Sequence, residues 1–274
     1  MTRVFVTGAT GFIGRAFCAE SQLQVTTGDL RQPGWEERLR GNEVVVHLAG
    51  VAHARASDAM YEEVNVRATR QLAEAAVRAG VRRMVFISSI KVNGEATPID
   101  HPFRAGDTPN PQDEYGRSKW RAEQVLARVG GLEVVVVRPP LVYGPGVRAN
   151  FRRLLQLVDS GIPLPFGSVR NRRSFVFVGN LVALLRCCAE HRAAAGKTFL
   201  AADGEDLSTP ELVRRMATAL GRNARLVPFP PFLLPSKLAG SLLVDVREAR
   251  DQLQWQPPYG VDAGLAVTAA AYRA

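Results

Sequence analysis

Residues 3–14, Arg-Val-Phe-Val-Thr-Gly-Ala-Thr-Gly-Phe-Ile-Gly, decide the fold of this chain. The apolar, β-branched run over residues 3–7 predicts a buried strand, and the glycines that follow predict a tight turn into a helix. Glycine is needed where the chain turns sharply, where backbone approaches a pyrophosphate, and where the helix packs on the strand. The N–H groups that begin this helix can then bind phosphate. The stretch therefore predicts a dinucleotide-binding unit.

Strands and helices alternate through the first two-thirds of the chain, which predicts a parallel sheet covered by helices on both faces. Val44–Val46 and Val134–Val137 are continuous β-branched runs, as expected of central strands that are buried on both sides. We therefore predict an α/β fold with a doubly wound parallel sheet of Rossmann type. The expected strands are 3–7, 24–27, 44–48, 83–88 and 133–138, and the expected helices lie near 12–22, 58–79 and 112–129.

After residue 142 the alternation gives way to clusters of Pro and Gly, which predicts a small C-terminal α/β lobe over the ligand-binding edge of the sheet. We assign residues 1–145, with a returning segment near 174–200, to a dinucleotide-binding domain. The substrate-binding lobe then comprises residues 146–173 and 201–274.

The composition is that of an ordinary globular enzyme, with 274 residues of which 46% are hydrophobic. No secretion signal and no apolar run of membrane-spanning length is visible, so we expect a cytoplasmic protein without membrane insertion. Cys18, Cys187 and Cys188 lack the spacing of a disulfide framework or a metal site, so we expect reduced thiols and no metal. The net charge of +9 is dispersed over helix faces, which argues against nucleic acid as a partner.

A candidate cofactor-selecting carboxylate follows the second expected strand, in Gly28-Asp29-Leu30-Arg31. Asp29 stands about where an acidic residue binds the adenosine ribose hydroxyls of NAD. Arg31 would instead suit the 2′-phosphate of NADP, and an Asp at a turn can also serve only to cap that turn. We favour NAD(H) and leave NADP(H) open. The expected cofactor contacts here are Gly8, Thr10, Gly11, Phe12, Ile13, Gly14, Asp29, Leu30 and Arg31.

Three separate stretches supply a candidate catalytic set of Ser89, Tyr115, Lys119 and Asn65. Tyr115 and Lys119 are four residues apart and so share one face of a helix. A phenol is a poor base at neutral pH, but a neighbouring ammonium group favours its ionised form. Tyr115 can then exchange a proton with a substrate hydroxyl, while Ser89 bonds the same oxygen. Lys119 would also bind the nicotinamide ribose.

With these motifs assembled, the chain resembles the extended short-chain dehydrogenases/reductases of the NAD-dependent epimerase/dehydratase family. Finer matches are similar to a bacterial subgroup of UDP-sugar 4-epimerases and UDP-4-keto-sugar reductases that serve O-antigen and other surface-polysaccharide pathways. The resemblance rests on GATGFIG at 8–14, HLAG at 47–50, NVRAT at 65–69, SSIKVNG at 88–94, YGRSK at 115–119 and RPPLVYGPG at 138–146.

The resemblance implies a UDP-sugar substrate. It places Asn150 and Arg173 on the diphosphate, Phe166 beside the uracil, and His53 and Lys91 toward the sugar. It also implies that Pro139 and Val142 flank the nicotinamide. The other cofactor contacts that it implies are Leu48, Ala49, Gly50 and Ser88. Relatives often dimerise through two helices of each subunit, so a homodimer that uses the helix carrying Tyr115 is a further expectation.

The chain departs from the family between the first helix and His47, where too few residues remain for two strands. We therefore expect one edge strand to be missing. Asp29 then has two interpretations, as the ribose-binding residue or as a later family aspartate near the adenine. A trimmed adenosine side favours cofactor exchange, because fewer contacts allow faster dissociation.

These features leave three functions open. Dehydration is excluded, because Ile90, Lys91 and Val92 follow Ser89 where a dehydratase needs an acidic pair. A UDP-4-keto-sugar reductase is the first expectation and a UDP-sugar 4-epimerase is the alternative. A non-catalytic dinucleotide-binding regulator is less expected, because Tyr115 and Lys119 are both present.

Overall fold

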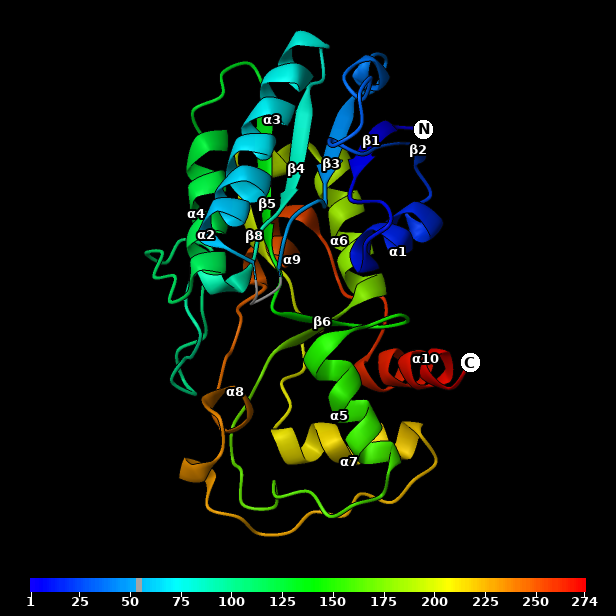
Figure 1. Ribbon diagram of the computed structural model, residues 1–274, viewed down its shortest axis with the longest axis vertical. Coiled ribbons are helices and arrows are strands. Elements are labelled where there is room, and N and C mark those ends of the chain that lie inside the picture. Colours follow the sequence, from blue (N-terminus) through cyan, green and yellow to red (C-terminus); the bar gives the residue numbers. More distant parts are fainter. Residues whose placement is uncertain (53–55) are drawn as a thin grey trace.

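The computed structural model describes residues 1–52 and 56–274, and its described residues form a six-stranded parallel sheet with the order β2-β1-β3-β4-β5-β8 (Figure 1). The order of the strands reverses at β1, because β1 pairs with β2 on one side and with β3 on the other. This reversal of strand order creates the crevice in which doubly wound folds bind ligands. The strands are β1 (Arg3–Thr7), β2 (Gln24–Gly28), β3 (Val44–His47), β4 (Arg83–Ile87), β5 (Glu133–Arg138) and β8 (Thr198–Leu200).

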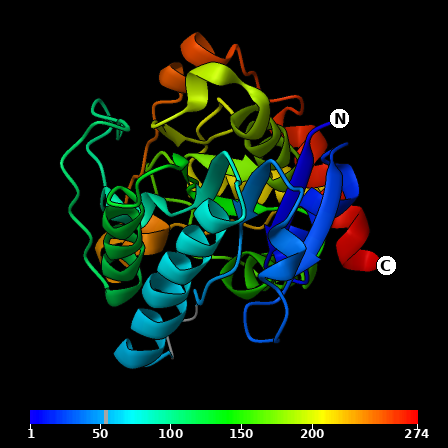
Figure 2. The same ribbon diagram turned by 90° about the horizontal axis from the view of Figure 1, so that it is seen from above.

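Helices cover both faces of the sheet, because successive side chains on each buried strand point to opposite sides. Val44 and Val46 pack toward α1 (Phe12–Glu20) and α6 (Val178–Glu190). Val45 packs on the other face. That face is covered by α2 (Asp58–Tyr61), the π-helical turn η2 (Glu62–Arg67), α3 (Ala68–Arg78) and α4 (Glu114–Leu126), as the view from above shows (Figure 2). The doubly wound fold is confirmed.

The chain between β2 and β3 contains the short 3-10 turn η1 (Glu37–Leu39) and no strand. All residues of this segment are described, so β2 is the edge of the sheet. The expected loss of one edge strand is confirmed.

The smaller lobe is built on a second apolar core, which includes Phe151, Phe166 and Leu212. Its helices are α5 (Ala149–Asp159), α7 (Thr209–Ala219) and α10 (Val261–Arg273), with the short helix α8 (Ser236–Ala239) at its border. The two-stranded parallel sheet of β6 (Leu141–Tyr143) and β7 (Phe175–Phe177) joins this lobe to the larger one.

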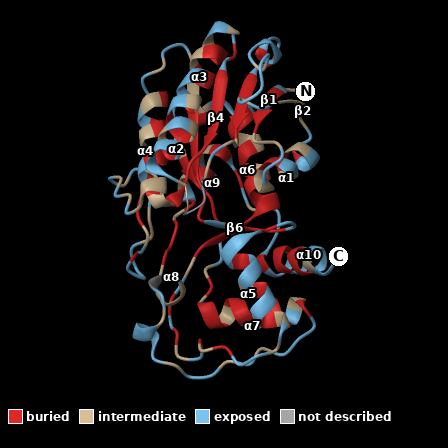
Figure 3. Ribbon diagram, in the orientation of Figure 1, coloured by how far each residue is buried: buried red, intermediate tan, exposed pale blue. Residues whose placement is uncertain are grey.

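One segment assigned to the smaller lobe packs elsewhere. Residues 242–255, which include α9 (Arg247–Leu253), place Leu242, Val244 and Trp255 in the core beneath the large sheet. The physical reason is that α9 packs beside β8, where apolar side chains are buried against the sheet (Figure 3). The exact division into domains otherwise stays a prediction.

Several predicted element boundaries differ by one to three residues from those observed. The helix expected near 112–129 begins at Glu114, because Asp113 caps it by accepting a hydrogen bond from the N–H of Gly116. The helix expected over 58–79 is interrupted by the π-helical turn η2. Within the described part of the chain, no helix is both long enough and apolar enough to cross a membrane.

Candidate active site

The glycine-rich turn after β1 has the geometry that a pyrophosphate requires. Gly8 has a positive φ of 71°, and a Cβ there would lie 2.5 Å from the Ala49 nitrogen. A Cβ on Gly14 would lie 2.0 Å from the Gly8 oxygen, so larger residues are excluded at both positions. The N-cap of α1 is Gly11, whose lack of a side chain leaves the first N–H groups of the helix open to a ligand. The predicted turn therefore fits a dinucleotide.

A cavity of about 180 Å³ lies at the carboxyl ends of β3, β4 and β5. It brings together side chains from stretches far apart in the sequence. Its lining includes predicted residues, namely Ile13, Leu48, Gly50, Ser88, Ser89, Tyr115, Lys119, Pro139 and Val142. Val51, Ala52, Ile87 and Pro140 also line it, although the sequence analysis did not select them.

Tyr115 is partly buried in this cavity and forms a side-chain hydrogen bond with Ser89. Burial raises the pKa of the Tyr115 phenol to about 12, and the carboxylate of Asp113 also raises it, whereas the Ser89 hydrogen bond lowers it. The Tyr61 ring lies 6.2 Å from the Tyr115 ring, centroid to centroid. The Tyr115 phenol is therefore neutral at physiological pH, and its ionisation requires additional positive charge nearby.

Lys119 lines the same cavity as this phenol, and it is 3% exposed. Its Nζ donates a hydrogen bond to the Ile87 carbonyl at 2.9 Å and lies 4.6 Å from the centroid of the Phe86 ring. Burial lowers the pKa of the Lys119 ammonium to about 8, and the nearby Glu123 carboxylate opposes that change. The ammonium is therefore available at neutral pH, at a cost to the stability of the fold.

This cost gives a testable prediction for Lys119→Met. In the unfolded chain a lysine has a pKa of about 10.4, so the folded protein bears the penalty fully below pH 8 and loses it above pH 10.4. The variant should therefore unfold at higher urea concentration at pH 7, with a gain of roughly 1–3 kcal/mol that vanishes near pH 10.5. Lys237→Met, at an exposed position, should change stability by less than about 0.5 kcal/mol. A less stable Lys119→Met protein at pH 7 would contradict the prediction.

Asn65 lies in the π-helical turn η2, a type of distortion that often occurs at functional sites. Its Oδ1 accepts from the Val51 N–H at 2.8 Å, and its Nδ2 donates to the Val51 carbonyl at 3.0 Å and to Ser118 Oγ at 2.9 Å. Asn65 thereby ties the segment after β3 to the helix that carries Tyr115. Its catalytic role stays a prediction, and the structure adds a positioning role.

A buried histidine supports this turn. His47 Nδ1 pairs with the Thr7 hydroxyl at 2.6 Å and Nε2 pairs with the Thr69 hydroxyl at 2.8 Å. Because the Thr69 hydroxyl donates to the Asn65 carbonyl, it must accept from the imidazole, which places the proton on Nε2. Burial lowers the pKa of His47 to about 3, and the Lys119 charge lowers it further. A neutral imidazole thus connects β1 to the turn that holds Asn65.

The sequence analysis missed a buried ion pair beneath the cavity. Arg138 and Glu123 are 4% and 5% exposed at their side chains, and Arg138 Nε donates to Glu123 Oε1 at 3.0 Å. Ser88 also donates to Glu123, and Arg138 donates to Asn93 Oδ1 at 3.0 Å. Glu123 follows Lys119 by four residues, so the helical spacing that selected Tyr115 and Lys119 also indicated this position.

The second-lobe residues implied by the resemblance lie in different environments. Arg173 is partly buried and donates to the Gly240 carbonyl at 2.9 Å. Asn150 is exposed near the start of α5, and the Phe166 ring is 5% exposed within the second core. Lys91 is paired with Asp113 and, at 2.8 Å, with Glu95. His53 lies outside the described residues, and the substrate contacts of all these positions stay predictions.

Asp29 directly follows β2, the strand that pairs with β1, so it lies at the same sheet edge as the glycine turn. Arg31 Nη2 donates to Asp29 Oδ2 at 2.7 Å and Nε donates to Oδ1 at 3.0 Å. These hydrogen bonds lower the pKa of the Asp29 carboxyl to about 2. Both candidate selectors of the adenosine ribose therefore occupy one small region.

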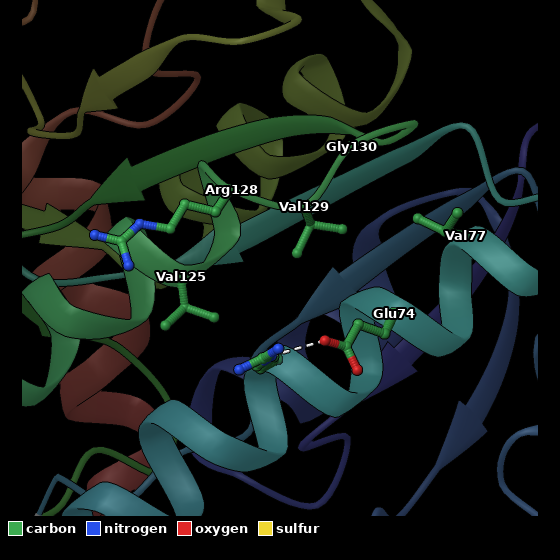
Figure 4. A pocket seen from close by; sticks show the side chains of 7 residues that line it. Glu74, Val77, Val125, Arg128, Val129 and Gly130 are labelled. Atoms are coloured by element: carbon green, nitrogen blue, oxygen red, sulfur yellow. Dashed lines mark hydrogen bonds and ion pairs between the residues drawn. The ribbon is translucent and has the colours of Figure 1, made fainter.

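A larger hollow, of about 510 Å³, lies between α3 and the end of α4 (Figure 4). Arg70 and Glu74 form an ion pair on one wall, with a nitrogen–oxygen distance of 2.7 Å. None of the dinucleotide or catalytic motifs contributes to this hollow, so the smaller cavity is the candidate active site.

Comparison with known proteins agrees with this geometry. The family model described as "NAD dependent epimerase/dehydratase family" matches residues 19–202. A UDP-glucose 4-epimerase of Vibrio cholerae is 38% identical over 98% of this chain and 95% of its own length. The chain belongs to the NAD-dependent epimerase/dehydratase family. As a member of this family, it is an NAD-dependent enzyme.

Solved structures superimpose over nearly the whole chain. MoeE5 in complex with UDP-glucuronic acid and NAD has a TM-score of 0.82 and 30% identity, over 99% of both chains. UDP-N-acetylglucosamine 4-epimerase from Bacillus cereus has a TM-score of 0.85 over 100% of both chains, and its 20% identity supports the fold alone.

Proposed function

We propose that this protein is an NAD-dependent UDP-sugar 4-epimerase. The observation that carries the proposal is the nearly end-to-end similarity to the Vibrio cholerae UDP-glucose 4-epimerase, at 38% identity. The cavity supports it, because Tyr115, Ser89 and Lys119 line one space beside the glycine turn. The sequence analysis expected a UDP-4-keto-sugar reductase first and a UDP-sugar 4-epimerase as the alternative. The comparisons favour the epimerase.

Each polar group in the cavity has a defined task in this reaction. Tyr115 removes the proton of the C4 hydroxyl and returns it, and the Ser89 hydroxyl bonds the same oxygen. Lys119 contributes the positive charge that an ionised phenol needs. Bound NAD supplies reversible hydride acceptance at C4 and the further positive charge of its ring. Asn65 holds Val51, which lines the cavity, in place while the sugar changes configuration, and neutral His47 supports Asn65 through Thr69.

A diphosphate-bearing substrate is supported by Arg173. In the described part of the chain, no carboxylate lies within ion-pair distance of its guanidinium, although the side chain is partly buried. Burial lowers the pKa of Arg173, and the more distant charge of the Glu95 carboxylate only partly opposes this change. A phosphate group would supply that partner in a forked hydrogen-bonded geometry. MoeE5, which binds UDP-glucuronic acid, supports the UDP class.

NAD is the proposed cofactor, with Asp29 as the residue that binds the ribose hydroxyls. The support is its position directly after the strand that pairs with β1. The solved relative MoeE5 also binds NAD.

Asp29→Ser tests this assignment. The variant should bind NADH about 10- to 100-fold more weakly, because a hydrogen bond to a charged group contributes about 1.5–3 kcal/mol. Its affinity for NADPH should hold or rise, because the carboxylate no longer repels a 2′-phosphate. Fluorescence titration of both cofactors measures the ratio, and Asp100→Ser is the matched exposed control. An unchanged NADH/NADPH ratio would remove Asp29 from this role.

The reaction itself is tested by incubating the protein with UDP-glucose and UDP-N-acetylglucosamine and following the sugars by proton NMR. An epimerase converts each active substrate to its C4 epimer without net consumption of NADH. A second candidate, the UDP-4-keto-sugar reductase, is favoured by the missing edge strand beside Asp29, since fewer adenosine contacts speed cofactor exchange. Stoichiometric loss of NADH with a 4-keto sugar, and no epimerisation, would decide for the reductase.

A further inference from the structure

Two surface segments meet at the end of the smaller lobe that lies farthest from the large sheet (Figure 1). Residues 160–173 and 221–240 are joined by a parallel bridge between Leu164 and Leu226. The Val227 N–H donates to the Leu164 carbonyl at 3.0 Å, and the Gly167 N–H donates to the Val227 carbonyl at 2.9 Å. These contacts make one continuous surface, which we call the end surface.

The end surface exposes large apolar side chains to water. Phe232 is 84% exposed and Leu233 is 61% exposed, in the 3-10 turn η5 (Pro231–Leu233). Val227 and Ile162, which lie in the two segments outside this turn, are 41% and 48% exposed. Prolines before and after the turn restrict its backbone, so little conformational freedom is lost when it binds. An apolar tip of this kind indicates a binding surface.

The two segments of the end surface carry charged side chains of one sign only. Neither segment contains an Asp or a Glu, whereas together they carry Arg170, Arg172, Arg173, Arg222, Arg225 and Lys237. Arg222 and Arg172 are neutralised by Asp159 and Asp206. Arg170, Arg225 and Lys237 are exposed and form no ion pair with any residue that the structure describes. The tip is therefore bordered by uncompensated positive charge.

We propose that the end surface docks the protein peripherally onto an anionic lipid bilayer, with Phe232 and Leu233 entering the interface and Arg170, Arg225 and Lys237 contacting headgroups. Exposed apolar side chains beside basic residues are what binding in the plane of such an interface requires. A second copy of the chain fits less well, because a symmetric contact would oppose the same uncompensated cations. None of the five side chains proposed to contact the bilayer lines the candidate active-site cavity, so this inference does not depend on the proposed reaction.

The docked surface also borders the active-site side of the lobe. The Gly240 carbonyl accepts a hydrogen bond from the Arg173 guanidinium. Burial would raise the pKa of the Asp113 carboxyl, but its hydrogen bond to Lys91 lowers that pKa, and the charge of the Lys237 ammonium lowers it further. Docking would thus bring the segment that holds Arg173 toward the headgroup region.

The test is co-sedimentation of the full chain with vesicles. The probes are phosphatidylglycerol/phosphatidylcholine vesicles and vesicles of phosphatidylcholine alone, each at low and high salt. The expected result is binding to the anionic vesicles at least about tenfold stronger than to the neutral ones, and weaker at high salt. Phe232→Ser/Leu233→Ser and Arg170→Gln/Arg225→Gln should each weaken binding by at least about tenfold.

The matched control is Ile99→Ser/Val267→Ser, which removes two apolar side chains that are 45% and 44% exposed elsewhere on the surface. It should bind the anionic vesicles as the unmodified protein does, and circular dichroism should show all variants to be folded. Equal loss in the control, or no preference for anionic lipid, would overturn the proposal. So would a concentration-dependent dimer that Phe232→Ser/Leu233→Ser abolishes, because the end surface would then bind a second copy.

Discussion

Tyr115→Phe is expected to lower kcat by about 10²- to 10⁴-fold, the usual contribution of a positioned acid–base group. The variant retains the ring that packs beside Tyr61 and loses only the oxygen that hydrogen-bonds Ser89. Binding of NADH should therefore be preserved within about threefold, because the glycine turn is untouched. Stopped assays of sugar turnover and fluorescence titration of NADH measure the two quantities on the same preparation.

Tyr259→Phe is the matched control, since that ring is 42% exposed and packs on Phe177 away from the cavity. It should leave kcat unchanged. Near-normal turnover by Tyr115→Phe would show that another group moves the proton, and loss of NADH binding would show that the change had disturbed the cavity itself.

Arg138→Met is expected to lower the free energy of unfolding by about 3–5 kcal/mol, because it leaves the Glu123 carboxylate buried without its cation. The Ser88 hydroxyl still donates to Glu123 and the Lys119 ammonium still lies nearby, but neither replaces the hydrogen-bonded guanidinium that neutralises this buried carboxylate. Urea unfolding at pH 7 measures the loss.

Two further variants separate charge from packing in this test. Arg138→Met/Glu123→Leu replaces both charges by apolar groups and should recover most of the lost stability. Arg82→Met removes an ion pair to Glu133 whose side chains are 46% and 37% exposed, so it should cost less than about 1 kcal/mol. A loss in Arg138→Met no greater than that in Arg82→Met would mean that water or a shifted side chain already neutralises Glu123.

Local pattern was sufficient to predict β1 to β5 of the large sheet, because the central strands β3 and β5 contain continuous runs of valine. The short strand β8 was not among the expected strands. Local pattern was also sufficient for the glycine turn and for the Tyr115–Lys119 pair, whose spacing fixes them on one helix face. The missing edge strand followed from chain length alone, since residues 29–43 are too few for a strand and its crossover.

Other features depend on contacts between distant residues, and no local pattern encodes them. The pairing of Arg138 with Glu123 requires β5 and α4 to be placed side by side. The tautomer of His47 is set by two threonines from different elements. The π-helical turn at Asn65 looks like ordinary helix in the sequence, because one extra residue in a turn barely changes the hydrophobic periodicity.

Because β2 has a neighbour on one side only, its outer backbone groups have no strand to bond. The adenosine half of the cofactor would then rest on the part of the sheet that opens most readily, while the nicotinamide half rests on β3 and β4 at its centre. Ligand binding would tighten the first half far more than the second. The absence of a strand outside β2 would thus concentrate the protein's response to its cofactor at one edge of the sheet.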